Sequence, residues 1–308
     1  MRPPLLKKSM FDLVTVGHLS IDLIASPKIT TPKPTLGGPP TYVSLAARRL
    51  DAKVSVISKV GEDFSDTHIA WLKANGVDLS GLKRVKGAST TRFTLKYTNW
   101  KRRLQLKSRA PPVLPEDAAS SLRARAIHMA PIANELSREV VDKLRTLTDT
   151  LSLDPQGFVR EFDAKGNMRL RRWNGQRVLE QIDLYKSSSD EIRMVTGLAD
   201  LLLAMKKIHG YGAKTVIVTR GTKGSKLLLE GKLYDIPPCR PRVVQDPTGA
   251  GDVFIGAFLA EYLRGEDPAW CACVGSASAS FVVEGVGPDV FGGKEEIYAR
   301  AAKIYGKE

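Results

Sequence analysis

The amino-acid sequence predicts an α/β protein in which a mainly parallel sheet lies between two layers of helices. Short apolar runs of strand length alternate along most of the chain with amphipathic segments that are long enough to be helices. Parallel strands require such crossovers, and the helices then cover both faces of the sheet. A length of 308 residues suits one large unit of this kind. We therefore expect a single domain over residues 1–308.

The chain opens with strand, loop, helix and strand. A strand is predicted at 11–17 because an apolar run ends at a glycine, and a half-exposed strand at 21–25 because its side chains alternate. Residues 27–40 are rich in Pro, Thr and Gly and are predicted to form a loop. The elements that follow are a helix at 41–50, a buried strand at 54–57 and a helix at 69–75 that stops at a glycine.

The second half of the chain alternates more regularly. Each predicted strand is a short buried apolar run, and each predicted helix has apolar residues at spacings of three and four. The strands are predicted at 126–129, 151–153, 184–185 and 215–218, with two more candidates before residue 250. The helices are predicted at 137–148, 175–181, 190–195, 198–209 and 250–263, with further helices closing the chain.

Two segments, 19–36 and 88–108, do not fit this alternation. Side chains at 90–97 and 103–107 alternate with period two, which is typical of a hairpin, and residues 19–36 contain the half-exposed strand. We expect the two segments to pair as a small side sheet. A small sheet beside a ligand cleft would act as a lid.

The chain is strongly basic, with 47 Lys and Arg against 33 Asp and Glu and a formal net charge of +14. Ten Lys or Arg and no acid lie between Leu82 and Arg109, largely on the expected hairpin. Three interpretations stay open: contact with a phosphorylated acceptor or nucleotide, binding of RNA, or a solvated face, which is the commonest role of such residues. The hairpin has few aromatic residues for base stacking, so nucleic acid is not the expected partner.

Composition excludes the fibrous, disordered and membrane-spanning classes. Hydrophobic residues make up 43% of the chain and charged residues 26%. No apolar stretch approaches the ~20 residues that a bilayer span needs, and charged residues interrupt the run after residues 1–10, so no signal peptide is predicted. The three cysteines are an odd number, which favours reduced thiols. We expect a cytoplasmic protein without a membrane partner.

The strongest functional signal is the stretch at 245–252, Gln-Asp-Pro-Thr-Gly-Ala-Gly-Asp, which leads directly into a long helix. Gly249 and Gly251 let the backbone turn sharply and approach a ligand, and the helix directs its first N–H groups and the positive end of its dipole at that ligand. Such an arrangement binds an anion. Asp252 falls in the first helical turn, where beside an anion it could take a proton from an incoming hydroxyl. The alternative is a glycine turn followed by an ordinary helix-start aspartate.

This pattern resembles the signature of the ribokinase-like (PfkB) carbohydrate kinases, and the resemblance extends over residues 11–305. Other elements fall in the order that this family uses: Asp22 after the first strand, the pair Gly37 and Gly38 before a helix, and a turn from Thr219 to Gly224 after a strand. The resemblance implies a three-layer ribokinase-like fold with a small β-sheet lid. It also implies transfer of the γ-phosphoryl group of ATP to a hydroxyl of a small-molecule acceptor.

The resemblance implies roles for individual residues. The transfer residues are Asp252 as general base and the Gly249, Ala250 and Gly251 amides as an anion hole. The nucleotide-binding residues are Ser188, Thr219, Gly221, Gly224 and Thr248. Glu191 would hold Mg²⁺ through water, and Asp246 would belong to a site for a monovalent cation such as K⁺. The family usually has Asn where this chain has Ser188, although a hydroxyl can still orient a water.

Fewer residues of the sequence bear on the identity of the acceptor than on phosphoryl transfer. Asp22, Gly37 and Gly38 are the acceptor-binding residues that the resemblance implies. Arg109 lies on or beside the expected lid and could bind the phosphate of a sugar-phosphate acceptor. Three stretches, at 17–22, 102–110 and 153–160, resemble the archaeal myo-inositol kinases, in which a D-x-Q-G-F segment like the one at 154–158 follows a central strand.

That segment adds Asp154 and Gln156 at a strand end, where they would bind hydroxyls; a turn that only shapes the chain is the equal alternative. We therefore expect myo-inositol as the acceptor, with sugar phosphates and nucleosides as alternatives. A non-catalytic nucleic-acid-binding or regulatory protein on the same fold is a further alternative, and a homodimer through the lid is a further expectation.

Overall fold

The structure is a computed structural model that describes residues 11–26, 28–29, 31–98 and 101–306. The sequence-based expectations for residues 1–10 and for the hairpin turn at 99–100 lie outside these ranges.

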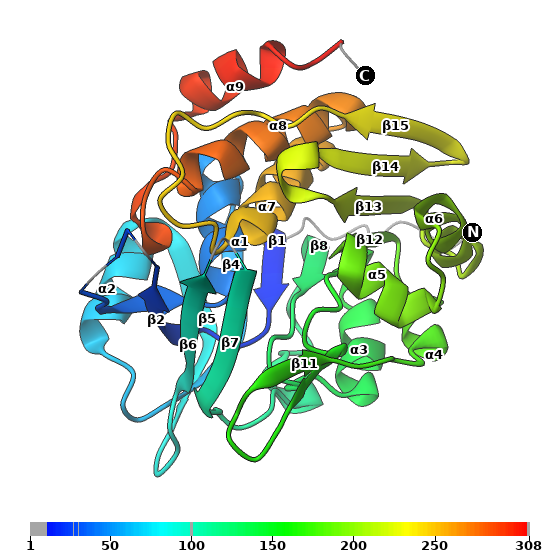
Figure 1. The fold of residues 1–308 in the computed structure, drawn as a ribbon. Coiled ribbons are helices and arrows are strands. Elements are labelled where there is room, and N and C mark those ends of the chain that lie inside the picture. The colour runs from blue at the N-terminus through cyan, green and yellow to red at the C-terminus, as the bar shows by residue number, and fades with distance from the viewer. Residues whose placement is uncertain (1–10, 27, 30, 99–100, 307–308) are drawn as a thin grey trace.

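The elements in chain order are shown in Figure 1. The strands are β1 (Phe11–Val16), β2 (Ser20–Ala25), β3 (Pro34–Gly37), β4 (Val54–Gly61), β5 (Val77–Val85), β6 (Thr91–Thr98), β7 (Lys101–Ser108), β8 (Ala124–Met129), β9 (Thr148–Leu153), β10 (Arg160–Phe162), β11 (Met168–Leu170), β12 (Leu184–Ser188), β13 (Thr215–Thr219), β14 (Ser225–Leu229) and β15 (Lys232–Ile236). The helices are α1 (Pro39–Arg49), α2 (Asp66–Ala74), α3 (Arg138–Arg145), α4 (Gln176–Leu179), α5 (Ser189–Thr196), α6 (Leu201–Gly210), α7 (Ala250–Tyr262), α8 (Pro268–Val282) and α9 (Lys294–Ala302), with 3-10 turns η1 (Pro115–Asp117), η2 (Gly221–Lys223) and η3 (Gly287–Asp289).

The central layer is a nine-stranded sheet with the order β15-β14-β13-β12-β9-β8-β1-β4-β5. Every pair of neighbours from β13 to β5 is parallel, whereas β14 and β15 add an antiparallel hairpin at one edge. The predicted mainly parallel sheet is therefore confirmed.

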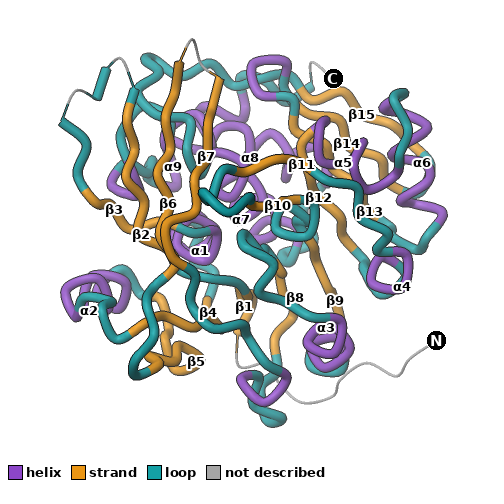
Figure 2. Tube along the Cα trace, turned by 60° about the horizontal axis from the view of Figure 1, so that its bottom comes forward, coloured by secondary structure: helices purple, strands orange, loops and turns teal. Residues whose placement is uncertain are grey.

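Helices cover both faces of this sheet, and β1 shows how one strand serves two cores. Leu13 packs into the core that it shares with α1, α2, α7, α8 and α9, while its neighbour Val14 packs into the core shared with α3, α5 and α6. Both side chains are fully buried, as expected for a parallel strand covered on two sides. The predicted three-layer arrangement is confirmed (Figure 2).

A separate four-stranded sheet has the order β3-β2-β6-β7. Strand β2 pairs with β6 in parallel, and the two outer pairs are antiparallel. The sheet thus joins the two segments that break the alternation in the sequence. Figure 2 shows it beside the ends of the main strands, near α1 and α7. Its inner face carries Phe93, Leu95 and Leu104, which pack with Ile132 and Ala133 from the loop after β8.

The predicted boundaries are wrong at three places. Residues 27–40 are not all loop, because Pro34–Gly37 forms β3 and α1 already begins at Pro39, where a proline ring suits the first helical turn. The helix predicted at 137–148 ends at Arg145, and Thr148 instead begins β9. The helix predicted from 198 begins only at Leu201, because the Asp200 side chain caps it by accepting a hydrogen bond from the Leu203 N–H at 2.8 Å.

Besides β3, three strands were not predicted. Strand β5 pairs only with β4 at the edge of the main sheet, so its outer residues are polar and give no apolar run. Strands β10 and β11 form a two-stranded sheet of three residues each, which is too short to show a period.

Acidic residues from other segments neutralise part of the basic stretch at 82–109. Lys83, Arg84 and Arg92 each contact an aspartate, at 2.8, 2.6 and 2.7 Å respectively. These three cations have structural partners, which weakens the case for an RNA-binding surface there. Among the described residues, no helix is both long enough and apolar enough to cross a bilayer.

Candidate active site

The carboxyl ends of β1, β9, β12 and β13 meet along one edge of the main sheet, where open α/β sheets hold their ligands. A cavity at this edge lies under the small sheet. It is lined by six of the residues singled out in the sequence: Asp22, Gly38, Gln156, Thr248, Gly249 and Asp252. Its other walls include two arginines and an apolar group from the small sheet and the loop after β8: Arg102, Arg160, Phe93, Leu95, Leu104 and Ile132.

The N-terminus of α7 opens into this cavity. Gly249 precedes the helix in the left-handed region, with φ of 79°, and a Cβ atom at this position would lie 2.5 Å from the Tyr42 ring. Both the backbone conformation and the close approach of Tyr42 therefore require glycine. The chain then enters the helix at Ala250, whose N–H lies 3.3 Å from the Pro247 carbonyl oxygen. The N–H groups of Gly251 and Asp252 have no backbone acceptor in the described part of the chain, so they are the donors that this helix start can offer to an anion.

Asp252 is in the first turn of α7, half-buried at the wall of the cavity. Its Oδ1 accepts a hydrogen bond from Gln156 Nε2 at 3.3 Å. Burial raises the pKa of Asp252 to about 6, and Lys186 and Arg160 limit that rise. A carboxylate with this pKa is largely ionised at neutral pH yet more basic than an exposed aspartate, as a general base should be.

Gln156 connects Asp252 to a buried arginine. Its Oε1 accepts a short hydrogen bond from an Nη of Arg160, a side chain that is 5% exposed. Its backbone N–H donates to Asp154 Oδ1 at 3.1 Å, and Asp154 Oδ2 accepts from Lys186 Nζ at 2.6 Å. The structure thus directs Asp154 at a lysine beneath the cavity, whereas Gln156 faces the cavity itself.

Asp22 lies on β2, across the cavity from the start of α7. Its Oδ1 accepts from the Ser20 hydroxyl at 2.8 Å, and a Cβ atom on Gly37 would lie 2.2 Å from Oδ2, so glycine at 37 makes room for the carboxylate. Burial raises the pKa of Asp22 to about 7, against the opposing effect of the Ser20 hydrogen bond. Arg109 is exposed instead, with its guanidinium 5.8 Å from the Phe162 ring centre, and does not line the cavity.

The residues expected to bind nucleotide and metal lie at the ends of β12 and β13. Ser188 Oγ and N–H donate to Glu191 Oε2 at 2.7 and 2.8 Å, and the Glu191 N–H donates back to Ser188 Oγ, which is a capping box at the start of α5. Thr219 ends β13. After it, Gly221 has a φ of 57° with open space around it, so the turn exposes backbone at the point where a ligand could approach.

Gly224, by contrast, packs against the end of β15, where a Cβ atom would lie 2.1 Å from the Ile236 carbonyl oxygen. That close contact explains why a glycine stands at position 224. The described residues contain no cluster of three or more His, Cys, Asp or Glu that could hold a metal. A magnesium ion held mainly by phosphates and water needs only one or two protein carboxylates, so Glu191 alone remains compatible with such a site.

The loop before α7 is fixed by Asp246. Its Oδ1 accepts from the Thr248 N–H at 2.9 Å and from the Thr248 hydroxyl at 2.6 Å, and its Oδ2 lies 3.5 Å from the Gly287 backbone N. The Tyr97 hydroxyl of β6 lies 2.9 Å from Thr248 Oγ1. The small sheet is therefore hydrogen-bonded to the residue directly before the glycine turn.

Sequence reasoning missed four groups around the cavity: Tyr42, Arg102, Arg160 and Lys186. Arg160 stands four residues after Gln156, and its place in the 153–160 segment was the signal that could have identified it. Lys186 also carried a signal, because a lysine inside an apolar strand is seldom buried without a partner. Arg102 belongs to the basic stretch at 82–109, for which contact with a phosphorylated acceptor or nucleotide was one open interpretation. Tyr42 carried no signal, since only the fold brings it to the cavity.

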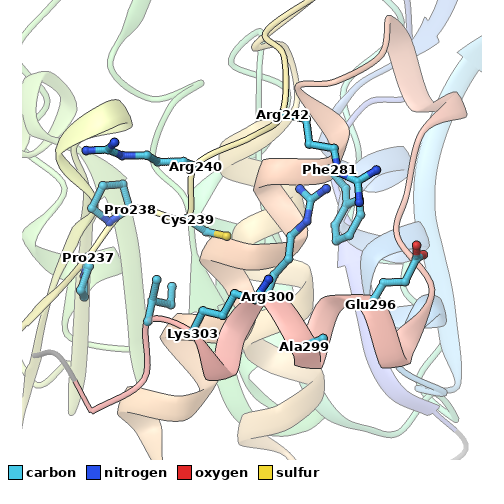
Figure 3. A pocket seen from close by; sticks show the side chains of 11 residues that line it. Pro237, Pro238, Cys239, Arg240, Arg242, Phe281, Glu296, Ala299, Arg300 and Lys303 are labelled. Carbon is cyan, nitrogen blue, oxygen red and sulfur yellow. The ribbon is translucent and has the colours of Figure 1, made fainter.

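A second cavity, of about 670 Å³, lies elsewhere, between the loop at 237–242 and helices α8 and α9 (Figure 3). Arg300 projects into it from α9, 3.5 Å from the Phe281 ring centre, and pairs with Glu284 at 2.8 Å. Glu296, in the first turn of α9, also lines this cavity, but its Oε2 accepts a hydrogen bond from the Gly293 N–H at 2.9 Å and so caps that helix. The glycine turn and Asp252 line the smaller cavity, which is therefore the candidate active site.

Comparison with known proteins gives consistent matches over nearly the whole chain. The model of the pfkB family of carbohydrate kinases matches residues 10–291. A cytidine kinase of Thermococcus kodakarensis is 30% identical, over 89% of this chain and 97% of that enzyme. An inositol 3-kinase of Arabidopsis thaliana is 27% identical, over 83% of this chain and 70% of that enzyme. The solved structure of a pyrophosphate-dependent kinase of the ribokinase family superimposes with a TM-score of 0.78 and 25% identity, over 90% and 96% of the two chains.

Proposed function

The chain belongs to the pfkB family of carbohydrate kinases, and from this premise we propose that it transfers the γ-phosphoryl group of ATP to a hydroxyl of a small polyhydroxylated acceptor. One observation carries the proposal: Asp252 lies at the wall of a cavity, directly after the glycine turn at the start of α7, and Asp22 and two arginines line the same cavity. An anion hole and a base at one cavity are the two things that phosphoryl transfer to an alcohol requires.

In the proposed reaction, each group of the site has one role. The acceptor hydroxyl oxygen forms a bond to the γ-phosphorus, its proton passes to the Asp252 carboxylate, and the bond from the γ-phosphorus to the bridging oxygen breaks to release ADP. The backbone N–H groups at the start of α7 stabilise charge on the transferred group. Gln156 orients Asp252 through its 3.3 Å hydrogen bond, and the small sheet excludes water.

We assign Mg²⁺ to the side of the site where Glu191 lies. Bound there, the ion would neutralise phosphate oxygens and polarise the donor. Glu191 would hold it through water, and Ser188 would keep the Glu191 carboxylate in place through the capping box.

Glu191→Gln is expected to raise the Mg²⁺ concentration needed for half-maximal activity severalfold, because the variant loses the charge that attracts the hydrated ion. Glutamine also forms a capping box, so thermal stability should stay near that of the wild type and serves as the internal control. The measurement is a Mg²⁺ titration of initial rate. An unchanged titration would show that Glu191 only caps α5.

We propose a cyclitol or similar polyol as the acceptor, with myo-inositol as the first candidate. The cavity presents carboxylate acceptors at Asp22 and donors at Arg102 and Arg160, and the buried Tyr42 hydroxyl has no hydrogen-bond partner among the described residues. Burial, followed by the nearby Asp22 carboxylate, holds the pKa of Tyr42 well above its usual range, so the phenol stays a neutral donor. An acceptor with several hydroxyls would satisfy all of these groups.

Asp22→Ala is expected to lower kcat/KM for the acceptor by more than tenfold. The reason is that an acceptor hydroxyl loses its hydrogen-bond partner in a site built to bind hydroxyls. Its control is Asp149→Ala, since Asp149 is exposed on β9 away from the cavity. Steady-state kinetics with varied acceptor at saturating ATP gives the comparison. Equal kcat/KM values for the two variants would remove Asp22 from the acceptor site.

A nucleoside is the second candidate acceptor. The cavity wall of Phe93, Leu95, Leu104 and Ile132 could face a base, and a relative at 30% identity is a cytidine kinase. A panel of myo-inositol, cytidine, uridine and fructose 6-phosphate separates the candidates, with ATP and pyrophosphate compared as donors. Activity on cytidine without activity on myo-inositol would replace the cyclitol by a nucleoside and leave the kinase assignment unchanged.

A further inference from the structure

Lys186 is a buried cation that the roles proposed above leave unused. It is the third residue of β12, and its side chain is 5% exposed. Its Nζ donates to Asp154 Oδ2 at 2.6 Å, and the Asp154 side chain is 2% exposed. Removing two charges from water is costly, and a pair of well-packed apolar residues would often be at least as stable. The burial of this pair therefore calls for a reason other than stability.

The neighbour of Lys186 on the other side is the start of α7. A Cβ atom on Gly251 would lie 2.8 Å from Lys186 Nζ. Gly251 lies inside α7 and does not have a positive φ, so the backbone conformation does not explain a glycine there. The ammonium group explains it, because any side chain at 251 would separate the ammonium from the N-terminus of the helix.

The charges around Lys186 keep it protonated. Burial by itself would lower the pKa of Lys186, but the carboxylates of Asp154, Asp252 and Glu191 together raise it above its ordinary value. An ammonium group has three N–H donors, and in the described part of the chain one hydrogen-bond acceptor, Asp154 Oδ2, occupies it. The remaining donors are available at the place where the anion hole, the candidate base and the candidate metal residue converge.

We propose that Lys186 is a further catalytic residue, whose ammonium group donates a hydrogen bond to a non-bridging oxygen of the phosphoryl group in transfer. Asp154 is its positioning residue and holds the ammonium against Gly251. The inference rests on the proposed function and deepens it: the transferred group meets a fixed cation from the sheet side as well as the amide groups of α7. A preorganised donor of this kind acts on charge that develops in the transition state.

The test compares two buried Lys–Asp pairs. Lys186→Met should lower kcat by ~10²–10³-fold, the range for loss of one preorganised donor, while the acceptor KM changes little. The control is Lys59→Met, because Lys59 Nζ contacts Asp117 Oδ2 at 2.8 Å with both side chains similarly buried, although Asp117 keeps a second partner in Lys83, also at 2.8 Å. This control variant should lose thermal stability without losing turnover. Loss of stability with normal kcat in Lys186→Met would overturn the proposal.

Two further measurements keep the test decisive. The double variant Lys186→Met with Asp154→Asn leaves no lone buried charge, so it should fold even where the single variant fails, and it should remain inactive. Calorimetry with ADP and aluminium fluoride, a mimic of the phosphoryl group in transfer, should show binding to the wild type and weakened binding to this variant, with ADP alone bound equally. Equal binding of the mimic would overturn the role of Lys186. A wild type that neither binds the mimic nor phosphorylates any acceptor would instead overturn the proposed function.

Discussion

Asp252→Asn is expected to lower turnover by at least ~10²-fold, because loss of a general base typically costs 10²–10⁴ in rate. Asparagine has the same shape and keeps an oxygen for the hydrogen bond from Gln156, so the geometry of the cavity should change little. ATP affinity should stay near that of the wild type, since Asp252 is proposed to act on the acceptor. Near-normal turnover would contradict its assignment as the base.

The pH dependence of the same variant is the internal control. Because Asp252 must be deprotonated to accept a proton and its pKa in the ligand-free site is about 6, kcat/KM of the wild type should fall as the pH drops through this value. The residual activity of Asp252→Asn should lack that acid limb. An identical limb in both proteins would assign the ionisation to another group.

Gly249→Ala is expected to lower kcat by about 10²-fold, the lower end of the loss for one anion-hole donor. An alanine would have to keep a φ of 79° and place its Cβ 2.5 Å from the Tyr42 ring, so the ring and the first amides of α7 would both move. Steady-state kinetics and thermal unfolding should show a large loss of turnover and a moderate loss of stability.

Gly265→Ala separates backbone strain from displacement of the site. Gly265 has a similar φ of 85°, but a Cβ atom there would meet nothing within 4 Å. It should lose some stability through strain and retain full turnover. Equal losses of turnover in the two variants would mean that strain, rather than the amides beside Tyr42, causes the effect.

The fold could be predicted as far as its elements are local. The buried strands β1, β8, β9 and β13 are apolar runs, and α7 follows a glycine motif. Each of these elements can therefore be predicted from about ten consecutive residues. Strand β5 was missed because an edge strand such as Val77–Val85 needs only one apolar face, and here Asp78, Lys83 and Arg84 interrupt it.

The site divides in the same way. The glycine turn and Asp252 are adjacent in sequence, so one motif predicted both the anion hole and the candidate base. Lys186 comes from a central strand and Tyr42 from α1, and both contact the glycine turn at the start of α7. No spacing between residues in the sequence predicts that they come together there. Asp154 shows the opposite limit: its position at a strand end was predicted, but the lysine that it faces became apparent only from the packing.

The order of the elements along the chain has a consequence for biosynthesis. All strands of the main sheet lie within residues 11–236, whereas α7 and α8 come after residue 249. Leu184, Ile217 and Ile236 from the sheet pack in the core that contains these two helices. On the ribosome, which makes the N-terminus first, α1 and α2 are available early, but the part of this sheet face that packs against α7 and α8 stays exposed until these helices emerge. A chain halted before α7 is therefore expected to expose apolar surface that the complete chain buries, and to be prone to aggregation.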